Sequence, residues 1–131
     1  MVRLKGGDPY VFGRGGEEAD ALHEAGVPFE VIPGITSAIA GPAYAGIPVT
    51  HRKYCTQFTV FTGHEDVNKK ESSLDLKGIA GAQGTKIMLM GMQKLADVCE
   101  ALTGYGQEPS TPAAAIQWAT TGIQRTVTGT V

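Results

Sequence analysis

The sequence predicts an α/β protein in which short strands alternate with helices. Apolar runs rich in β-branched residues are followed by segments of helical spacing, and this order is typical of parallel sheets. Glycine supplies 18 of the 131 residues, about twice its usual share, and several glycines directly follow a predicted strand. Because α/β proteins bind ligands where strands end in turns, the same pattern indicates a binding site at these turns.

The first two predicted elements flank a glycine-rich turn. Residues 2–4 alternate like a strand and run into residues 5–9, a Lys-Gly-Gly-Asp-Pro turn through which no strand could continue. Residues 17–25 carry acidic side chains in the first turn and are followed directly by a glycine. Both signals predict a helix there.

A second strand and a second helix follow. Residues 27–32 are apolar except for Glu30 and end at a Pro-Gly pair, which predicts a strand. Thr36 and Ser37 then supply hydroxyl caps for a helix of small residues that ends near Gly46. Because Pro42 lacks a backbone donor, we expect a kink or a fresh start inside that helix.

A proline-bearing polar segment at 47–53 fits neither the strand nor the helix period. It predicts a connector, and we place a domain boundary there. The expected units are residues 1–50, the second half of an N-terminal α/β domain, and residues 51–131, an incomplete C-terminal α/β domain.

The rest of the chain again alternates between strands and helices. The predicted strands are apolar runs bounded by glycine or proline, and the predicted helix has apolar residues at helical spacing. In order, we expect a strand at 57–62, a loop with a short helix at 67–83, a strand at 85–90, a helix at 95–102, a buried strand at 112–118 and a strand at 124–131.

Charge and composition exclude several classes of protein. The net charge is -2 and no basic run is present, so nucleic-acid binding is not expected. No stretch is apolar enough to cross a membrane and the start lacks a signal-peptide core, so we expect a cytoplasmic chain. Cys55 and Cys99 lack metal-ligand spacing, so we expect reduced thiols and no metal.

The turns carry the candidate ligand contacts. The first turn matches neither the GxGxxG nor the GxxxxGK[ST] phosphate pattern, which disfavours a nucleoside triphosphate. Gly6 and Gly7 instead expose bare backbone to a flat ligand, with the Asp8 carboxylate beside them; the alternative is a purely structural turn. Thr36 and Ser37 either cap their helix or offer donors to a ligand carboxylate.

Two further kinds of residue are candidates. Met90 follows a predicted strand and either frames a ligand or fills the core. Scattered basic residues near predicted loops suit a substrate rich in carboxylates, or are solvated surface charges. The basic candidates for the substrate are Arg14, Arg52 and Arg125.

Residues 2–18, VRLKGGDPYVFGRGGEE, resemble the signature of the uroporphyrinogen-III C-methyltransferases within the tetrapyrrole methylase family. The opening run is highly specific, and the resemblance extends over essentially the whole chain. Further motifs follow in the order that the family shows, at 33–37, 45–52, 62–65, 90–91 and 124–125.

The resemblance implies a two-domain α/β fold, with the end of the N-terminal parallel-sheet domain and most of the C-terminal mixed-sheet domain in this chain. It implies transfer of methyl groups from S-adenosylmethionine to C2 and C7 of uroporphyrinogen III, giving precorrin-2 and S-adenosylhomocysteine for sirohaem and cobalamin synthesis. It also implies a homodimer and a tetrapyrrole substrate. The cofactor contacts carried over are Gly6, Gly7, Asp8, Val11, Thr36, Ser37, Met90 and Ala119, where the family commonly has a glycine at the last position.

The family's first strand and its catalytic acid and base precede residue 2 in the pattern, and its last part follows residue 131. We therefore expect a fragment that is weak or inactive alone, with no catalytic residue to name. Alternatives are another precorrin methyltransferase, a sirohaem synthase segment, or a non-catalytic binding or dimerisation module.

Overall fold

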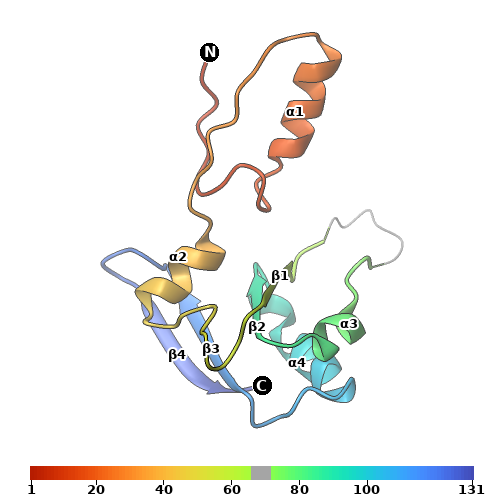
Figure 1. The fold of residues 1–131 in the computed structure, drawn as a ribbon, viewed down its shortest axis with the longest axis vertical. Coiled ribbons are helices and arrows are strands. Elements are labelled where there is room, and N and C mark those ends of the chain that lie inside the picture. Colours follow the sequence, from red (N-terminus) through yellow and green to blue (C-terminus); the bar gives the residue numbers. More distant parts are fainter. Residues whose placement is uncertain (66–71) are drawn as a thin grey trace.

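The computed structural model describes residues 1–65 and 72–131 (Figure 1). Residues 1–35 form an arm that projects from the rest of the chain, and α2 joins the two parts. The elements in chain order are α1 (Gly15–Glu24), α2 (Ser37–Tyr44), β1 (Phe58–Thr62), α3 (Leu76–Gly81), β2 (Thr85–Leu89), the 3-10 helix η1 (Met92–Lys94), α4 (Leu95–Gly104), β3 (Pro112–Gln117) and β4 (Arg125–Thr130).

The hydrophobic core lies where α3 and α4 cover one face of the parallel pair β1 and β2. Phe61 is opposite Met88 in the register, so both side chains point to the same face of the sheet. On that face Phe61 packs with the helix residues that form the buried cluster. The cluster comprises Phe61, Ile79, Val98 and Leu102, with Leu74, Leu76, Ala80 and Met88 packed against it.

Both predicted helices of the first half are confirmed. α1 begins two residues before the predicted start, and its first turn contains the acidic pair Glu17 and Glu18. In α2 the Thr36 side chain caps the helix by accepting a hydrogen bond from the Ala38 amide. Of the two alternatives predicted at Pro42, the fresh start is wrong, because the helix runs through this residue to Tyr44, and the kink stays a prediction.

The predicted strands at 2–4 and 27–32 are wrong. Both segments are extended but belong to no sheet, and no backbone hydrogen bond joins one to the other within the described residues. Their apolar side chains are largely exposed; Val2 and Leu4, for example, are 89% and 85% exposed. A strand needs a neighbour for its backbone groups and a covered face for its side chains, and neither segment has them here.

The second-half elements are confirmed, with one correction. The parallel pair and the antiparallel pair β3–β4 form two separate two-stranded sheets. The expected burial of residues 112–118 is wrong, since most of β3 and all of β4 are exposed. No third described strand pairs with these two strands, and most of their positions stay accessible. The part of the predicted 67–83 segment before residue 72 lies outside the described residues.

The predicted connector contains a tight turn. His51 and Cys55 exchange backbone hydrogen bonds and form an isolated bridge, and the His51 side chain accepts a 3.1 Å hydrogen bond from the Lys53 amide. This turn leads directly into β1. The domain boundary that we place near residue 50 stays a prediction.

Candidate functional site

A cavity of about 360 Å³ lies where the arm meets α2 and the loop between β3 and β4. Three segments far apart in the sequence line it: the glycine turn, the start of α2, and the β3–β4 loop. Its size is within the range usual for small-molecule sites. The lining residues are Gly6, Gly7, Asp8, Ile35, Thr36, Ser37, Ala40, Gly41, Ala119 and Thr120.

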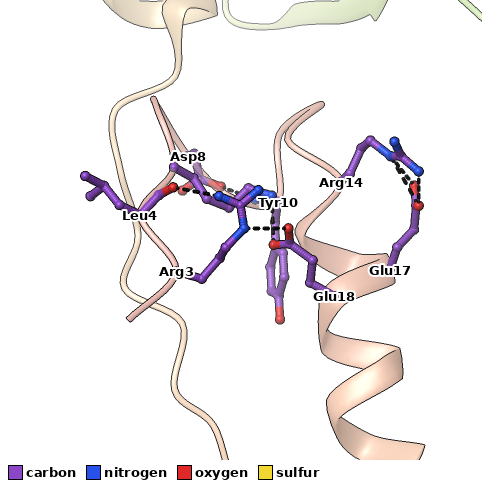
Figure 2. Close-up of polar contacts among 8 residues, drawn as sticks. Arg3, Leu4, Asp8, Tyr10, Arg14, Glu17 and Glu18 are labelled. Atoms are coloured by element: carbon purple, nitrogen blue, oxygen red, sulfur yellow. Dashed lines mark hydrogen bonds and ion pairs between the residues drawn. The ribbon is translucent and has the colours of Figure 1, made fainter. Parts of the chain in front are cut away.

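The glycine turn is fastened to the segment before α2 by the Asp8 carboxylate. One carboxylate oxygen accepts from the Tyr10 amide at 2.9 Å and the other from the Gly34 amide at 3.1 Å. Figure 2 shows the first of these bonds. A Cβ on Gly34 would lie only 2.1 Å from the Gly7 carbonyl oxygen, so this close approach requires glycine. We call this arrangement of Asp8 and Gly34 the clasp.

The second wall of the cavity is the first turn of α2. The Thr36 carbonyl accepts hydrogen bonds from the amides of Ile39 and Ala40, both at 3.0 Å. The Thr36 hydroxyl accepts a hydrogen bond from the Ala38 amide. Ser37 is the first residue of the helix and lines the cavity. Because the first amides of a helix carry partial positive charge, this end suits a carboxylate of a ligand.

The third wall is the loop between β3 and β4. Ala119 and Thr120 reach the cavity, and a Cβ built on Gly41 would be in ordinary contact with the Ala119 methyl group at 3.5 Å. Gly41 is buried. The loop therefore packs directly on the helix that forms the second wall.

The three candidate arginines come from separate parts of the chain and none lines the cavity. Arg14 precedes α1, and its guanidinium forms an ion pair with Glu17 at 2.6 Å (Figure 2). Arg52 is exposed in the turn before β1. Arg125 begins β4 and lies 5.7 Å from the centre of the Trp118 ring, a cation–π contact.

An ion-pair cluster ties the first extended segment to α1 (Figure 2). Glu18 accepts from Lys5 at 2.8 Å and from Arg3 at 3.2 Å, and the Lys5 side chain is only 12% exposed. The hydrogen bond from Lys5, with further contributions from both cations, lowers the pKa of Glu18 below its ordinary value of 4.5. The cluster therefore holds the residue directly before Gly6 against the helix.

Since the folded-state pKa of Glu18 is lowered, its contribution to stability is present above pH 4.5 and is lost as the pH falls through the lowered value. We expect Glu18→Gln to lower the free energy of unfolding at pH 7 and to leave it unchanged at a pH well below 4.5. Urea titrations at both pH values measure this. Lys5→Met should reproduce the loss at pH 7, and an equal effect of Glu18→Gln at both pH values would contradict the prediction.

Comparison with known proteins places the chain in a family. The family model of the tetrapyrrole (corrin/porphyrin) methylases matches residues 1–131. The chain belongs to the tetrapyrrole methylases. The predicted family is therefore confirmed over the whole chain.

Curated relatives of this tetrapyrrole methylase carry related names. "Uroporphyrinogen-III C-methyltransferase" of Bacillus subtilis (strain 168) is 53% identical over 131 residues, which cover the whole chain and 27% of that protein. "S-adenosyl-L-methionine-dependent uroporphyrinogen III methyltransferase" of Methanosarcina barkeri is 55% identical over the whole chain and 51% of that protein. "Siroheme synthase" of Chromobacterium violaceum is 51% identical over the whole chain and 27% of that protein. The chain thus spans about a quarter to a half of these relatives.

Solved structures confirm the α/β fold of a tetrapyrrole methylase. Uroporphyrin-III C-methyltransferase from Thermus thermophilus, complexed with S-adenosyl homocysteine, matches with a TM-score of 0.85 at 38% identity, over 99% of this chain and 54% of that chain. A cobalt precorrin-4 methyltransferase matches with a TM-score of 0.84 at 25% identity, over 98% of this chain and 54% of that chain.

Most of the cofactor contacts that the resemblance implies lie together around the cavity. These are Gly6, Gly7, Asp8, Thr36, Ser37 and Ala119. The other two lie outside its lining. Val11 follows the glycine turn and donates its amide to the Asp8 carbonyl at 3.3 Å. Met90 directly follows β2, has a positive φ of 55° and is 60% exposed.

Sequence reasoning missed four lining residues, Ile35, Ala40, Gly41 and Thr120. A signal for two of them was present. Ala40 and Gly41 follow Ser37 at spacings of three and four, so all three lie on one face of a helix. All three side chains are small, and the first belongs to a candidate ligand contact. Such a helix face indicates a wall that a ligand can approach closely.

Two features are absent from the described part of this tetrapyrrole methylase. Within residues 1–65 and 72–131, no three His, Cys, Asp or Glu side chains gather in a way that could hold a metal ion. No helix in the described part of the chain has the length and apolar character needed to cross a membrane.

Proposed function

We propose that this chain carries the S-adenosylmethionine site of a methyltransferase that converts uroporphyrinogen III to precorrin-2 by methylating C2 and C7, with S-adenosylhomocysteine as the second product. The observation that carries the proposal is the cavity, because six of the eight implied cofactor contacts surround it. The names of the relatives and the cofactor product named for the Thermus thermophilus structure support it.

The residues around the cavity fit this cofactor. The positively polarised start of α2 and the Ser37 hydroxyl suit the carboxylate of the amino-acid part. Gly6 and Gly7 leave backbone exposed to the nucleoside part, and each Asp8 oxygen has a second lone pair beyond the amide that it already binds. When bound, the cofactor supplies an electrophilic methyl group on a sulfonium.

The work left to the chain is positioning. A sulfonium methyl group is already activated, so an electron-rich pyrrole carbon needs to be held in line with it. The new carbon–carbon bond forms as the methyl–sulfur bond breaks, and the macrocycle then loses a proton from another position. The cavity walls are the part of the chain that would fix the orientation of the cofactor. The family fold and the absence of a phosphate-binding glycine pattern agree with a ligand that is not a nucleoside triphosphate.

The proposed substrate has eight carboxylates, which cationic side chains would bind. We assign Arg14, Arg52 and Arg125 to this role, since all three are exposed. Arg14 also pairs with Glu17, and Arg125 lies over the Trp118 ring. Replacing each by glutamine should raise the dissociation constant for uroporphyrinogen III. An unchanged constant for all three variants would rule out the assignment.

The proposal includes a cytoplasmic homodimer. The accessible surface is 9819 Å², whereas a compact monomer of this mass exposes about 6,600 Å². The exposed apolar side chains of the arm and of the β3–β4 pair contribute to the excess and favour association. Sedimentation that gives a monomer at every concentration would contradict the dimer.

Calorimetric titration with S-adenosylhomocysteine tests the cofactor site, because the product requires no turnover. We expect one molecule to bind per chain with a micromolar dissociation constant, and no comparable heat from ATP. Ala40→Leu should weaken binding at least tenfold by filling the cavity. Ala43→Leu on the same helix is the matched control, since Ala43 lines a different, apolar hollow. No binding, or equal loss in both variants, would contradict the proposed site.

A further inference from the structure

The loop between β3 and β4 holds a conformation that its own residues disfavour. Trp118 and Thr120 have positive φ angles of 49° and 69°, in the left-handed region that residues other than glycine rarely adopt. These two residues flank Ala119, and Ala119 and Thr120 both line the cavity. Such backbone strain persists only where surrounding contacts fix the conformation.

The side chain of Gln124, the last residue of the loop before β4, makes two contacts that fix this conformation. Its amide oxygen accepts a 2.8 Å hydrogen bond from the Thr120 backbone amide, inside the loop. Its amide nitrogen donates a 3.3 Å hydrogen bond to the carbonyl of Tyr44, the last residue of α2 and 80 positions away in the sequence. The last carbonyls of a helix have no intrahelical partner, so this donor is well placed.

One amide thus joins two walls of the cavity. The loop forms the third wall and α2 forms the second, and Gln124 bonds to both without lining the cavity itself. The local bond from the Thr121 hydroxyl to the Trp118 carbonyl, 2.8 Å long, shapes the turn but does not reach α2. Only a side chain with both an acceptor and a donor makes the connection that Gln124 makes.

We propose that Gln124 is a positioning residue that holds Ala119 and Thr120 against α2 and thereby sets the width of the cavity. The inference rests on the proposed function where it concerns cofactor binding. Its structural half, the fixing of the loop, does not depend on any ligand.

The chain offers a direct reporter and a matched control. Trp118 is the single tryptophan and lies in the loop, so intrinsic fluorescence and its quenching by acrylamide report on the loop alone. Exchange of the Thr120 amide hydrogen reports on its bond to Gln124. Gln107→Ala is the control, because Gln107 also donates its side-chain amide, to the Thr111 hydroxyl at 2.7 Å, away from the cavity.

We expect Gln124→Ala to speed exchange of the Thr120 amide at least tenfold, to change Trp118 emission and quenching, and to weaken S-adenosylhomocysteine binding about tenfold. Gln107→Ala should alter none of these. Gln124→Glu keeps the acceptor for Thr120 but loses the donor to the Tyr44 carbonyl. Gln124→Glu should therefore keep slow exchange of the Thr120 amide but lower the affinity for S-adenosylhomocysteine. If Gln124→Ala does not fold, this second variant tests whether Gln124 positions the loop.

Two outcomes would overturn the inference. In the first, Gln124→Ala leaves Thr120 exchange and Trp118 fluorescence as in the wild type. In the second, the loop loosens while the affinity for S-adenosylhomocysteine stays the same. Failure of the wild-type chain to bind S-adenosylhomocysteine would count against the proposed function instead, and the exchange and fluorescence results would still decide whether Gln124 fixes the loop.

Discussion

Gly34→Ala is expected to weaken binding of S-adenosylhomocysteine roughly ten- to hundredfold, although Gly34 does not line the cavity. The added Cβ would lie 2.1 Å from the Gly7 carbonyl oxygen and 2.7 Å from the Gly7 carbonyl carbon. Both are backbone atoms, so the glycine turn itself has to move. Overpacking of this kind costs about 1–3 kcal/mol, and here the displaced segment is one wall of the cavity.

The same glycine-to-alanine change can be made where no atom is near. Gly16 lies in α1, and a Cβ built there meets nothing within 4 Å. Gly16→Ala should leave binding unchanged and stabilise the helix slightly, because alanine favours helices over glycine. Titration of both variants, with circular dichroism to check folding, measures the effect. Equal affinities for Gly34→Ala and the wild type would show that the clasp does not shape the cavity.

Asp8→Ala is expected to weaken S-adenosylhomocysteine binding by about ten- to hundredfold and to loosen the turn. It removes two hydrogen bonds to a charged acceptor, and such bonds contribute roughly 1.5–3 kcal/mol. Asp8→Asn should lie between Asp8→Ala and the wild type. One amide oxygen can still accept from the Tyr10 amide or the Gly34 amide, while the side-chain NH₂ group faces the other donor.

Hydrogen exchange separates the two roles that Asp8 can have. If the carboxylate fastens the turn, the amides of Tyr10 and Gly34 should exchange faster in Asp8→Ala without any ligand. If it acts only on the ligand, affinity should fall while both amides exchange as in the wild type. The second result would contradict the clasp.

Elements with local signals could be predicted from the sequence. α1 has acidic residues at its start and a glycine after its end, and both are signals of a helix. Thr36 has a hydroxyl and directly precedes α2, and it caps this helix as predicted. The segments 2–4 and 27–32 have strand-like residues but form no strand, because pairing depends on neighbours and not on the segment. Local sequence signals therefore predict the helices of this chain more reliably than its strands.

The residues of the site likewise divide into those that local sequence could predict and those that it could not. The glycine turn and the cap residues have chemistry that is visible in a few adjacent letters, and the structure brings them together at the cavity. The role of Gln124 depends on a partner 80 positions away, and that of Gly34 on the carbonyl of Gly7. Neither neighbour can be read from local sequence, since only the folded chain brings them into contact.

The separation of the core from the cavity has a consequence for how the molecule opens. The buried cluster lies between Phe61 and Leu102, and none of its members lines the cavity, whose walls join residues 6–8 to residues 119–120. The cluster can form within one short stretch of chain, whereas the cavity requires a long loop to close around it. We therefore expect the walls to have a lower local stability than the core and to open while α3 and α4 stay folded. Hydrogen exchange of the α3 and α4 amides then measures the survival of the core, and ligand affinity or Trp118 fluorescence measures the survival of the site.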